Sequence, residues 1–194
     1  STPNVKNVVR FAGEDDPFAA AYRMYKDANG NLTGEYEDKD GNPTWNVSDA
    51  VKTYSGIKGR TLINGLYYFN ESSGSVQGQM QTGRTAITVD GDTYYYYFSK
   101  DNTYPGYAYT NVIKDGYLYG QDGRCVVADD GNSYMEYILP NNVTNMNKKD
   151  DTTFVAGKSV IVSRSGKVKT GGTVTIDGTK YTIEKGIVTK WEDK

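Results

Sequence analysis

The feature that most constrains this sequence is a two-residue turn signal that occurs four times. Asn-Gly or Asp-Gly follows shortly after Ile or Val and shortly before Tyr, at Asn64-Gly65, Asp90-Gly91, Asp115-Gly116 and Asp177-Gly178. These pairs supply the positive φ angles that tight hairpin turns require, and between strand-forming residues they are a strong hairpin signal. The sequence therefore predicts antiparallel hairpins at these four positions.

A second repeated piece is Gly followed by any residue and then an apolar one. It occurs at Gly30, Gly74, Gly123, Gly166 and Gly186. One hairpin is too small to bury a face alone, so hairpins of this size must stack on their neighbours. The 18 Tyr residues suit such interfaces, because each ring buries a large area while its hydroxyl can reach a polar partner. The predicted fold is therefore all-β, an array of stacked antiparallel β-hairpins with a solenoid-like repeat.

Other parts of the chain depart from the hairpin pattern. Asp16, Pro17 and the apolar residues up to Tyr22 predict a short N-terminal helix or cap. Turn formers and charged residues predict a linker or long loop further along the chain. The predicted organisation is an N-terminal cap with a first diverged hairpin at 1–50, a Tyr-rich hairpin array at 51–139, the linker at 140–153 and a C-terminal hairpin pair at 154–194.

The composition argues against catalysis. The chain contains no His, which removes the commonest general base and the commonest zinc ligand. Cys125 is the single cysteine and is interpreted as a small buried apolar residue. Two carboxylate pairs could serve glycoside hydrolysis, but turn chemistry explains both of them, Glu35 with Glu37 and Asp129 with Asp130. The acidic runs lack the spacing of a calcium loop, so the sequence predicts no enzyme activity, no metal and no cofactor.

Charge and hydropathy exclude two classes of partner. The net charge is −2, and the modest basic surplus of residues 146–194 is weaker than the basic stripe that nucleic acid requires. No apolar run reaches the 18 or more residues typical of a membrane span. The sequence therefore predicts neither nucleic-acid binding nor membrane insertion.

The turns and aromatic residues together resemble a known family. Gly65-Leu66-Tyr67-Tyr68-Phe69-Asn70, followed by Gly74 and Gly78, is similar to the cell-wall-binding repeat of choline-binding proteins, glucan-binding domains and large clostridial toxins. The resemblance covers residues 54–127, with diverged copies at 27–34 and 157–188. It implies a β-hairpin solenoid without catalysis that binds choline or carbohydrate through aromatic residues. Because the two Trp residues, Trp45 and Trp191, lie outside the well-matched copies, carbohydrate or no small ligand is favoured over choline.

The Tyr-rich strands carry the candidate binding residues. In residues 94–98 alternate side chains point to opposite faces, so Tyr95 and Tyr97 lie opposite the face of Tyr94, Tyr96 and Phe98. One face must be core, and the other either packs on the next hairpin or offers rings for stacking on sugars. The predicted ligand-binding residues are Tyr67, Tyr95, Tyr97, Tyr107 and Tyr119.

Two functions fit this sequence. The first is a noncatalytic cell-wall or surface-polysaccharide binding module of a secreted or cell-surface bacterial protein, whose partner is a cell-wall polysaccharide or a host glycan. The alternative is a structural or adhesive spacer without a small-molecule ligand. An accessory part of an enzyme, separated from its catalytic domain, would have the same sequence features.

Overall fold

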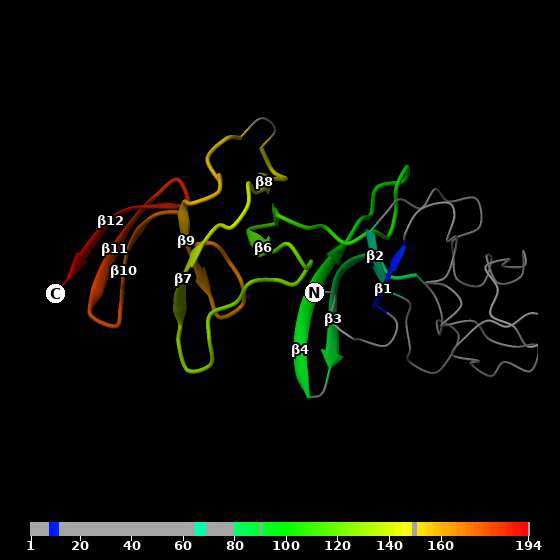
Figure 1. The fold of residues 1–194 in the computed structure, drawn as a ribbon, viewed down its shortest axis with the longest axis horizontal. Coiled ribbons are helices and arrows are strands. Elements are labelled where there is room, and N and C mark those ends of the chain that lie inside the picture. The colour runs from blue at the N-terminus through cyan, green and yellow to red at the C-terminus, as the bar shows by residue number, and fades with distance from the viewer. Residues whose placement is uncertain (1–7, 12–64, 69–79, 90, 149–150, 194) are drawn as a thin grey trace, which may run out of the picture. The chain divides into compact units, whose positions relative to one another are not determined.

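The computed structural model describes residues 8–11, 65–68, 80–89, 91–148 and 151–193 (Figure 1). In these ranges the chain forms twelve strands joined by turns and extended segments, without a helix. The fold is all-β, as the turn pattern predicts. The short helix predicted at 16–22 lies outside the described residues. Within the described ranges there is also no helix long and apolar enough to span a membrane.

The chain divides into two compact units, a first unit of Ser1–Tyr109 and a second unit of Thr110–Lys194. In the first unit, β1 (Val8–Phe11) pairs antiparallel with β2 (Gly65–Tyr68), and β3 (Gly83–Val89) pairs antiparallel with β4 (Asp92–Phe98). The second unit holds two antiparallel sheets, β7 (Tyr134–Ile138) with β9 (Ser159–Ser163), and β10 (Gly172–Ile176) with β11 (Thr179–Glu184) and β12 (Ile187–Asp193). In its third sheet, β5 (Val112–Lys114) pairs antiparallel with β6 (Tyr117–Tyr119) and parallel with β8 (Thr144–Asn145).

Three of the four predicted hairpin turns are confirmed. The turn between β5 and β6 has φ +54° at Asp115 and +84° at Gly116, and the turn between β10 and β11 has +48° at Asp177 and +83° at Gly178. Positive φ at both central residues is the signature of the two-residue turn that matches strand twist. The turn between β3 and β4 has φ +86° at Gly91.

The turn predicted at Asn64-Gly65 lies partly outside the described residues, because Asn64 is not among them. Gly65 is the first residue of β2, opposite Phe11 of β1. Among the described residues, β2 therefore pairs with a strand from the beginning of the chain.

The first unit builds its core on one face of β4. Tyr96 and Phe98 are fully buried and belong to a cluster with Leu66, Tyr68 and Ile87. The Phe98 ring stacks on Tyr96 at a centroid distance of 5.8 Å and on Tyr68 at 6.3 Å. The other face of β4, with Tyr95 and Tyr97, remains at least partly exposed. The alternation predicted from the sequence therefore holds along this strand.

The second unit stacks its sheets on both faces of β9. Val160 and Val162 belong to a cluster that reaches β5 and β6, whereas Ile161 packs with Ile183 and Val188 of the three-stranded sheet. Figure 1 shows β9 between β6 and the sheet of β10, β11 and β12. Successive strand residues point to opposite faces, so the continuous run of apolar residues in β9 is buried on both sides. All three of these side chains have no exposed surface.

The segment predicted as a linker packs into the core of the second unit. Val143 and Phe154 are each 6% exposed and join the same cluster as Val160. The Val143 amide donates to the Phe154 carbonyl at 2.7 Å, and the Thr144 amide donates to the Asn111 carbonyl at 2.9 Å. The described residues of 140–153, predicted as a linker or long loop, therefore pack beside β5.

Candidate functional site

The partly exposed face of the first unit carries four tyrosines, Tyr95, Tyr97, Tyr107 and Tyr109, which we call the aromatic row. Residues 107–109 run beside the end of β4, because the Tyr109 amide donates to the Tyr97 carbonyl and the Ser99 amide donates to the Tyr107 carbonyl, both at 2.8 Å. The Ala108 amide points the other way and donates to the Leu66 carbonyl of β2 at 2.8 Å. Backbone bonds to two strands thus hold this segment in place.

Three rings of the aromatic row contact one another. Tyr97 and Tyr109 are cross-strand neighbours whose rings stack with a centroid distance of 5.1 Å and an interplanar angle of 18°. Tyr107 meets Tyr109 edge to face at 5.5 Å and 62°. Aromatic pairs in these geometries contribute roughly 0.5–1.5 kcal/mol beyond the area they bury. The three rings are therefore held in fixed orientations before any ligand arrives.

Arg84 of β3 extends the aromatic row on its other side. Its guanidinium carbon lies 4.4 Å from the centroid of the Tyr95 ring, within the range of a cation–π contact. Tyr95 is 39% exposed, while Tyr97, Tyr107 and Tyr109 are half-buried. The row thus offers aromatic surface beside a planar donor group, which is suited to a ligand with both apolar faces and hydroxyl groups.

Tyr107 is in a distinct electrostatic environment. Partial burial raises the pKa of its phenol, and the neighbouring Tyr109 and Asp101 act in the same direction, whereas a hydrogen bond with Ser99 opposes them. Each of the three raising effects disfavours the phenolate.

An alkaline titration tests this environment. Subtracting the phenolate absorbance of Tyr107→Phe from that of the wild type should leave a component that titrates above the ordinary tyrosine pKa of about 10. Because the folded pKa is raised, the associated stability is fully present below the unfolded pKa and is lost as pH rises through the folded value. A difference component centred at or below the ordinary value would contradict the assigned environment.

Two of the five predicted binding residues are fully buried and cannot contact a ligand. Tyr67 and Tyr119 are both 0% exposed. In β2 the successive residues Leu66, Tyr67 and Tyr68 are all buried, and in β6 Leu118 and Tyr119 are both buried, so both strand faces are covered at these positions. Their rings pack inside the protein. Tyr95, Tyr97 and Tyr107 are the three predicted residues that the structure brings together at a surface.

A second aromatic group lies in the second unit and was not among the predicted binding residues. Trp191 of β12 is 51% exposed and donates from Nε1 to Oε2 of Glu136 at 2.8 Å. Its cross-strand neighbour Tyr181 donates its hydroxyl to Oε1 of the same carboxylate at 3.4 Å. Burial, followed by the Glu136 charge, raises the pKa of Tyr181. A regular register from the turn at Lys185-Gly186 would place Tyr181 opposite Lys190, and the register shift between Thr182 and Ile183 brings it opposite Trp191 instead. Nothing in the sequence indicates this shift or pairs the two rings with β7.

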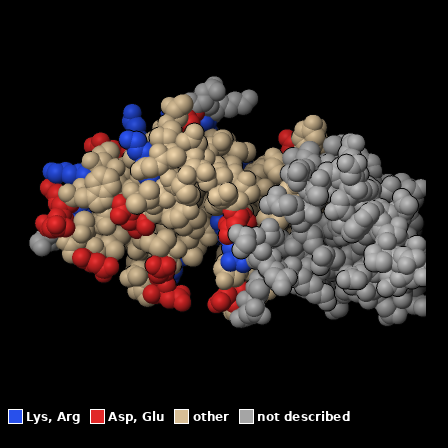
Figure 2. Space-filling view, viewed as in Figure 1, with Lys and Arg blue, Asp and Glu red and all other residues tan. Residues whose placement is uncertain are grey.

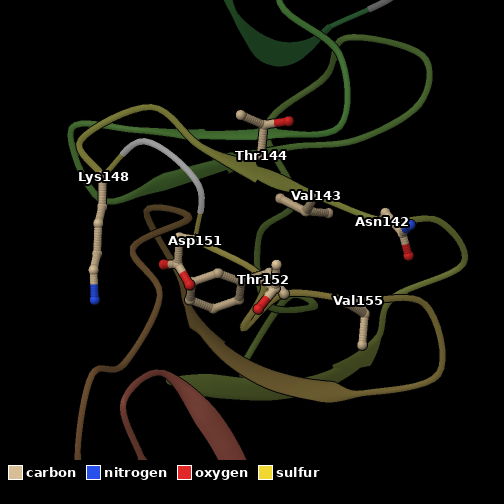
Figure 3. A pocket seen from close by; sticks show the side chains of 8 residues that line it. Asn142, Val143, Thr144, Lys148, Asp151, Thr152 and Val155 are labelled. Atoms are coloured by element: carbon tan, nitrogen blue, oxygen red, sulfur yellow. The ribbon is translucent and has the colours of Figure 1, made fainter.

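A pocket of about 300 Å³ lies elsewhere in the second unit, between residues 142–144 and 151–155 (Figure 3). The buried side chains of Val143 and Phe154 form its base, and Asn142, Lys148, Asp151 and Thr152 are polar residues of its lining. The sequence predicts this stretch only as a linker or long loop, because it has many turn formers and charged residues and few residues typical of strands.

The candidate catalytic groups of the sequence do not form a site within the described part of the chain. Asp129 and Asp130 are exposed in the loop before β7, and Glu35 and Glu37 lie outside the described residues. Cys125 is buried, with its sulfur 3.9 Å from the Val126 and Ser165 carbonyl oxygens. The described residues contain no cluster of three or more ligands suited to a metal ion. Figure 2 shows the charged side chains of these residues in small groups with uncharged surface between them.

No protein-family model and no curated protein matches the sequence. Solved structures similar to this chain include the modular autolysin LytC from Streptococcus pneumoniae, with 15% identity and a TM-score of 0.25 over 67% of this chain and 32% of that one. LytC in complex with a synthetic peptidoglycan ligand shows 14% identity and a TM-score of 0.27 over 87% and 40%. Alternansucrase in complex with isomaltononaose shows 17% identity and a TM-score of 0.26 over 85% and 11%.

This chain therefore spans less than half the length of each of these proteins. At these TM-scores the likeness carries no argument about function. The functional conclusion depends instead on the residues of the aromatic row.

Proposed function

We propose that this chain is a noncatalytic module that binds a cell-wall polysaccharide or a host glycan, as part of a secreted or cell-surface bacterial protein. The observation that carries the proposal is the aromatic row, in which Tyr97, Tyr107 and Tyr109 are held against one another at a partly exposed surface. The resemblance of residues 54–127 to cell-wall-binding repeats supports the same function.

The geometry of the row suits weak recognition of a polymer. A sugar ring presents an apolar face of C–H groups that can lie on an aromatic ring, while its hydroxyls reach donors and acceptors beside it. Arg84 over Tyr95 and the hydroxyls of the row supply such groups. Stacking of this kind tolerates different sugars, so affinity at one site is low and several sites acting together provide the retention. Trp191 beside Glu136 offers a further exposed ring for the same polymer.

The composition supports a module without catalysis. With no His in the chain and Cys125 buried, the usual nucleophile pairs have no members at the aromatic row. The surface between the small groups of charge is uncharged and suits a neutral polymer (Figure 2).

The burial of several tyrosines favours the second candidate function, a structural or adhesive spacer. Tyr67, Tyr96 and Tyr119 are all fully buried, which shows that much of the Tyr content contributes to packing. If the aromatic row packs on another part of the protein in the same manner, the hairpins simply extend the chain.

The test is retention on purified cell wall and on immobilised glucans, measured by sedimentation. The variant with Tyr95, Tyr97 and Tyr107 all changed to Ala should lose most of its retention. Because a polymer contacts several sites at once, the loss of two or more contacts together should lower the apparent affinity by about 10²-fold or more. The matched control changes the same three residues to Phe, which keeps the rings and removes only their hydroxyls, and it should lose much less retention than the Ala variant.

Circular dichroism must first show that both variants are folded, because the Tyr97–Tyr109 stack also contributes to stability. Equal retention of the folded Ala variant and the wild type would show that the aromatic row does not bind the polymer. The spacer function would then be the one that remains. Reducing ends released from the same polymers by the wild type would contradict the noncatalytic part of the proposal.

A further inference from the structure

The pocket beside β8 has the features of a binding site separate from the aromatic row. We propose that it binds a single neutral saccharide unit, through hydrogen bonds to Asp151 and Asn142 on either side of an apolar base. Its volume of about 300 Å³ is at the lower end of ligand pockets, which matches one sugar ring and not an oligosaccharide. The argument depends on the following contacts.

Asp151 is a fixed hydrogen-bond acceptor. Its Oδ2 accepts from Asn145 Nδ2 at 3.1 Å, and its Oδ1 accepts from the Thr153 amide at 2.9 Å. Hydrogen bonds with Thr153 and Asn145 lower the pKa of this carboxyl, so it is ionised at neutral pH. The Thr153 side chain makes a third hydrogen bond to this carboxylate. A carboxylate has about four lone-pair sites, so about one remains to accept from a ligand hydroxyl without any change of position.

Asn142 is a fixed donor at the other end of the pocket. Its Oδ1 accepts from the Ala156 amide at 2.9 Å, which orients the side-chain amide and leaves Nδ2 as a donor. Figure 3 shows Lys148 and Asp151 at one end of the pocket and Asn142 with Val155 at the other. Thr152 is exposed at the rim, where its hydroxyl can donate or accept.

The base of the pocket is apolar and rigid. Phe154 and Val143 are each 6% exposed and belong to the main core cluster of the second unit, and their backbones are joined by the 2.7 Å bond from the Val143 amide. An apolar base with fixed donors and acceptors around it is the usual composition of a small-molecule site. One face of a sugar ring can lie on this base while its edges reach Asp151 and Asn142.

The polar groups discriminate between classes of ligand. A simple anion would meet the ionised Asp151, and a metal ion would find one carboxylate where several oxygen ligands are needed. Adjacent sugar hydroxyls both donate and accept, which matches a lining that presents a carboxylate, an amide donor, an ammonium and a hydroxyl. A neutral polyhydroxylated ring is therefore the ligand class that satisfies the most groups.

The experiment uses the full chain labelled with ¹⁵N and titrated with the methyl glycosides of glucose, galactose, mannose and N-acetylglucosamine. A ligand of about a dozen heavy atoms with ordinary ligand efficiency is expected to bind with Kd of about 1 mM. Binding in the pocket should shift the amide signals of Thr153 and Ala156, whose hydrogen-bond acceptors are the proposed ligand contacts, for at least one of the sugars.

Asp151→Asn should weaken this binding about tenfold or more, because it removes the charged acceptor. Its Oδ1 can still accept from the Thr153 amide, although the amide nitrogen in place of Oδ2 can no longer accept from Asn145 Nδ2. Thr152→Val is a second variant at an exposed position and should weaken binding less. The matched control is Asp129→Asn, which removes the same charge from an exposed loop outside the pocket and should leave Kd unchanged.

This proposal and the polysaccharide-binding function can fail separately. The variant with Tyr95, Tyr97 and Tyr107 changed to Ala should keep the shifts at Thr153 and Ala156 if the pocket binds sugar by itself. Absence of shifts at these two amides with all four glycosides would overturn the proposal, as would equal Kd values for the wild type and a folded Asp151→Asn variant. Shifts confined to the aromatic row would overturn it as well, while supporting the function proposed for that row.

Discussion

Replacing Ile161 with Ala is expected to lower the free energy of unfolding of the second unit by about 2–5 kcal/mol. Ile161 has no exposed surface and packs on Ile183 and Val188, where β9 meets the three-stranded sheet β10–β12. The substitution removes three carbon atoms and leaves a cavity between β9 and the three-stranded sheet. Each of these two sheets buries one of its faces against the other, so the cavity weakens both. Because the total stability of a domain is about 5–15 kcal/mol, this loss would be a large part of it.

Urea denaturation followed by tryptophan fluorescence measures the effect. A Trp45→Phe background leaves Trp191 of β12 as the single tryptophan of the chain, so the signal reports on the three-stranded sheet. The control is Ile138→Ala, which removes the same atoms from a side chain that is 62% exposed, and it should change stability by about 0.5 kcal/mol or less. Similar losses for the two variants would contradict the stacking of β10–β12 on β9.

Replacing Gly186 with Ala is expected to cost about 2–5 kcal/mol, for two reasons that add. Gly186 has φ +84°, a conformation that costs an L residue roughly 1–2 kcal/mol. A methyl group there would also lie 2.8 Å from Cζ and 3.0 Å from Cε1 of Phe154. Since Phe154 is buried in the main core cluster, its ring cannot move aside freely, and overpacking of this kind costs about 1–3 kcal/mol.

Gly178→Ala separates the two contributions. Gly178 occupies the equivalent place in the preceding hairpin with φ +83°, but a methyl group there would meet no atom within 4 Å. It should therefore lose only the backbone cost, while the change in unfolded-chain entropy from Gly to Ala is the same in both variants. The same urea titration compares them. Equal losses of unfolding free energy in the two variants would show that the Phe154 ring moves aside for the added methyl group. The overpacking cost predicted for Gly186→Ala would then be absent.

The hairpins of this protein could be predicted from sequence because their causes are local. Asp-Gly pairs favour positive φ through their own local chemistry, as at Asp115-Gly116 and Asp177-Gly178, and the strands beside each turn are adjacent in the chain. The alternation along residues 94–98 is equally local, since successive strand residues must point to opposite faces. For these reasons the all-β class, three of the four turns and the common face of Tyr95 and Tyr97 follow from the sequence.

Only the tertiary structure decided which faces are covered, because coverage depends on segments distant in the chain. Tyr67 and Tyr95 are the same residue type in similar strands, yet Tyr67 has no exposed surface and Tyr95 is 39% exposed. Trp191 meets Glu136 across 55 positions, and Asn142 is oriented by Ala156 across 14. The sequence by itself determined where the chain turns and which residues share a strand face. Packing between distant strands determined which of those residues became core and which remained at a surface able to bind.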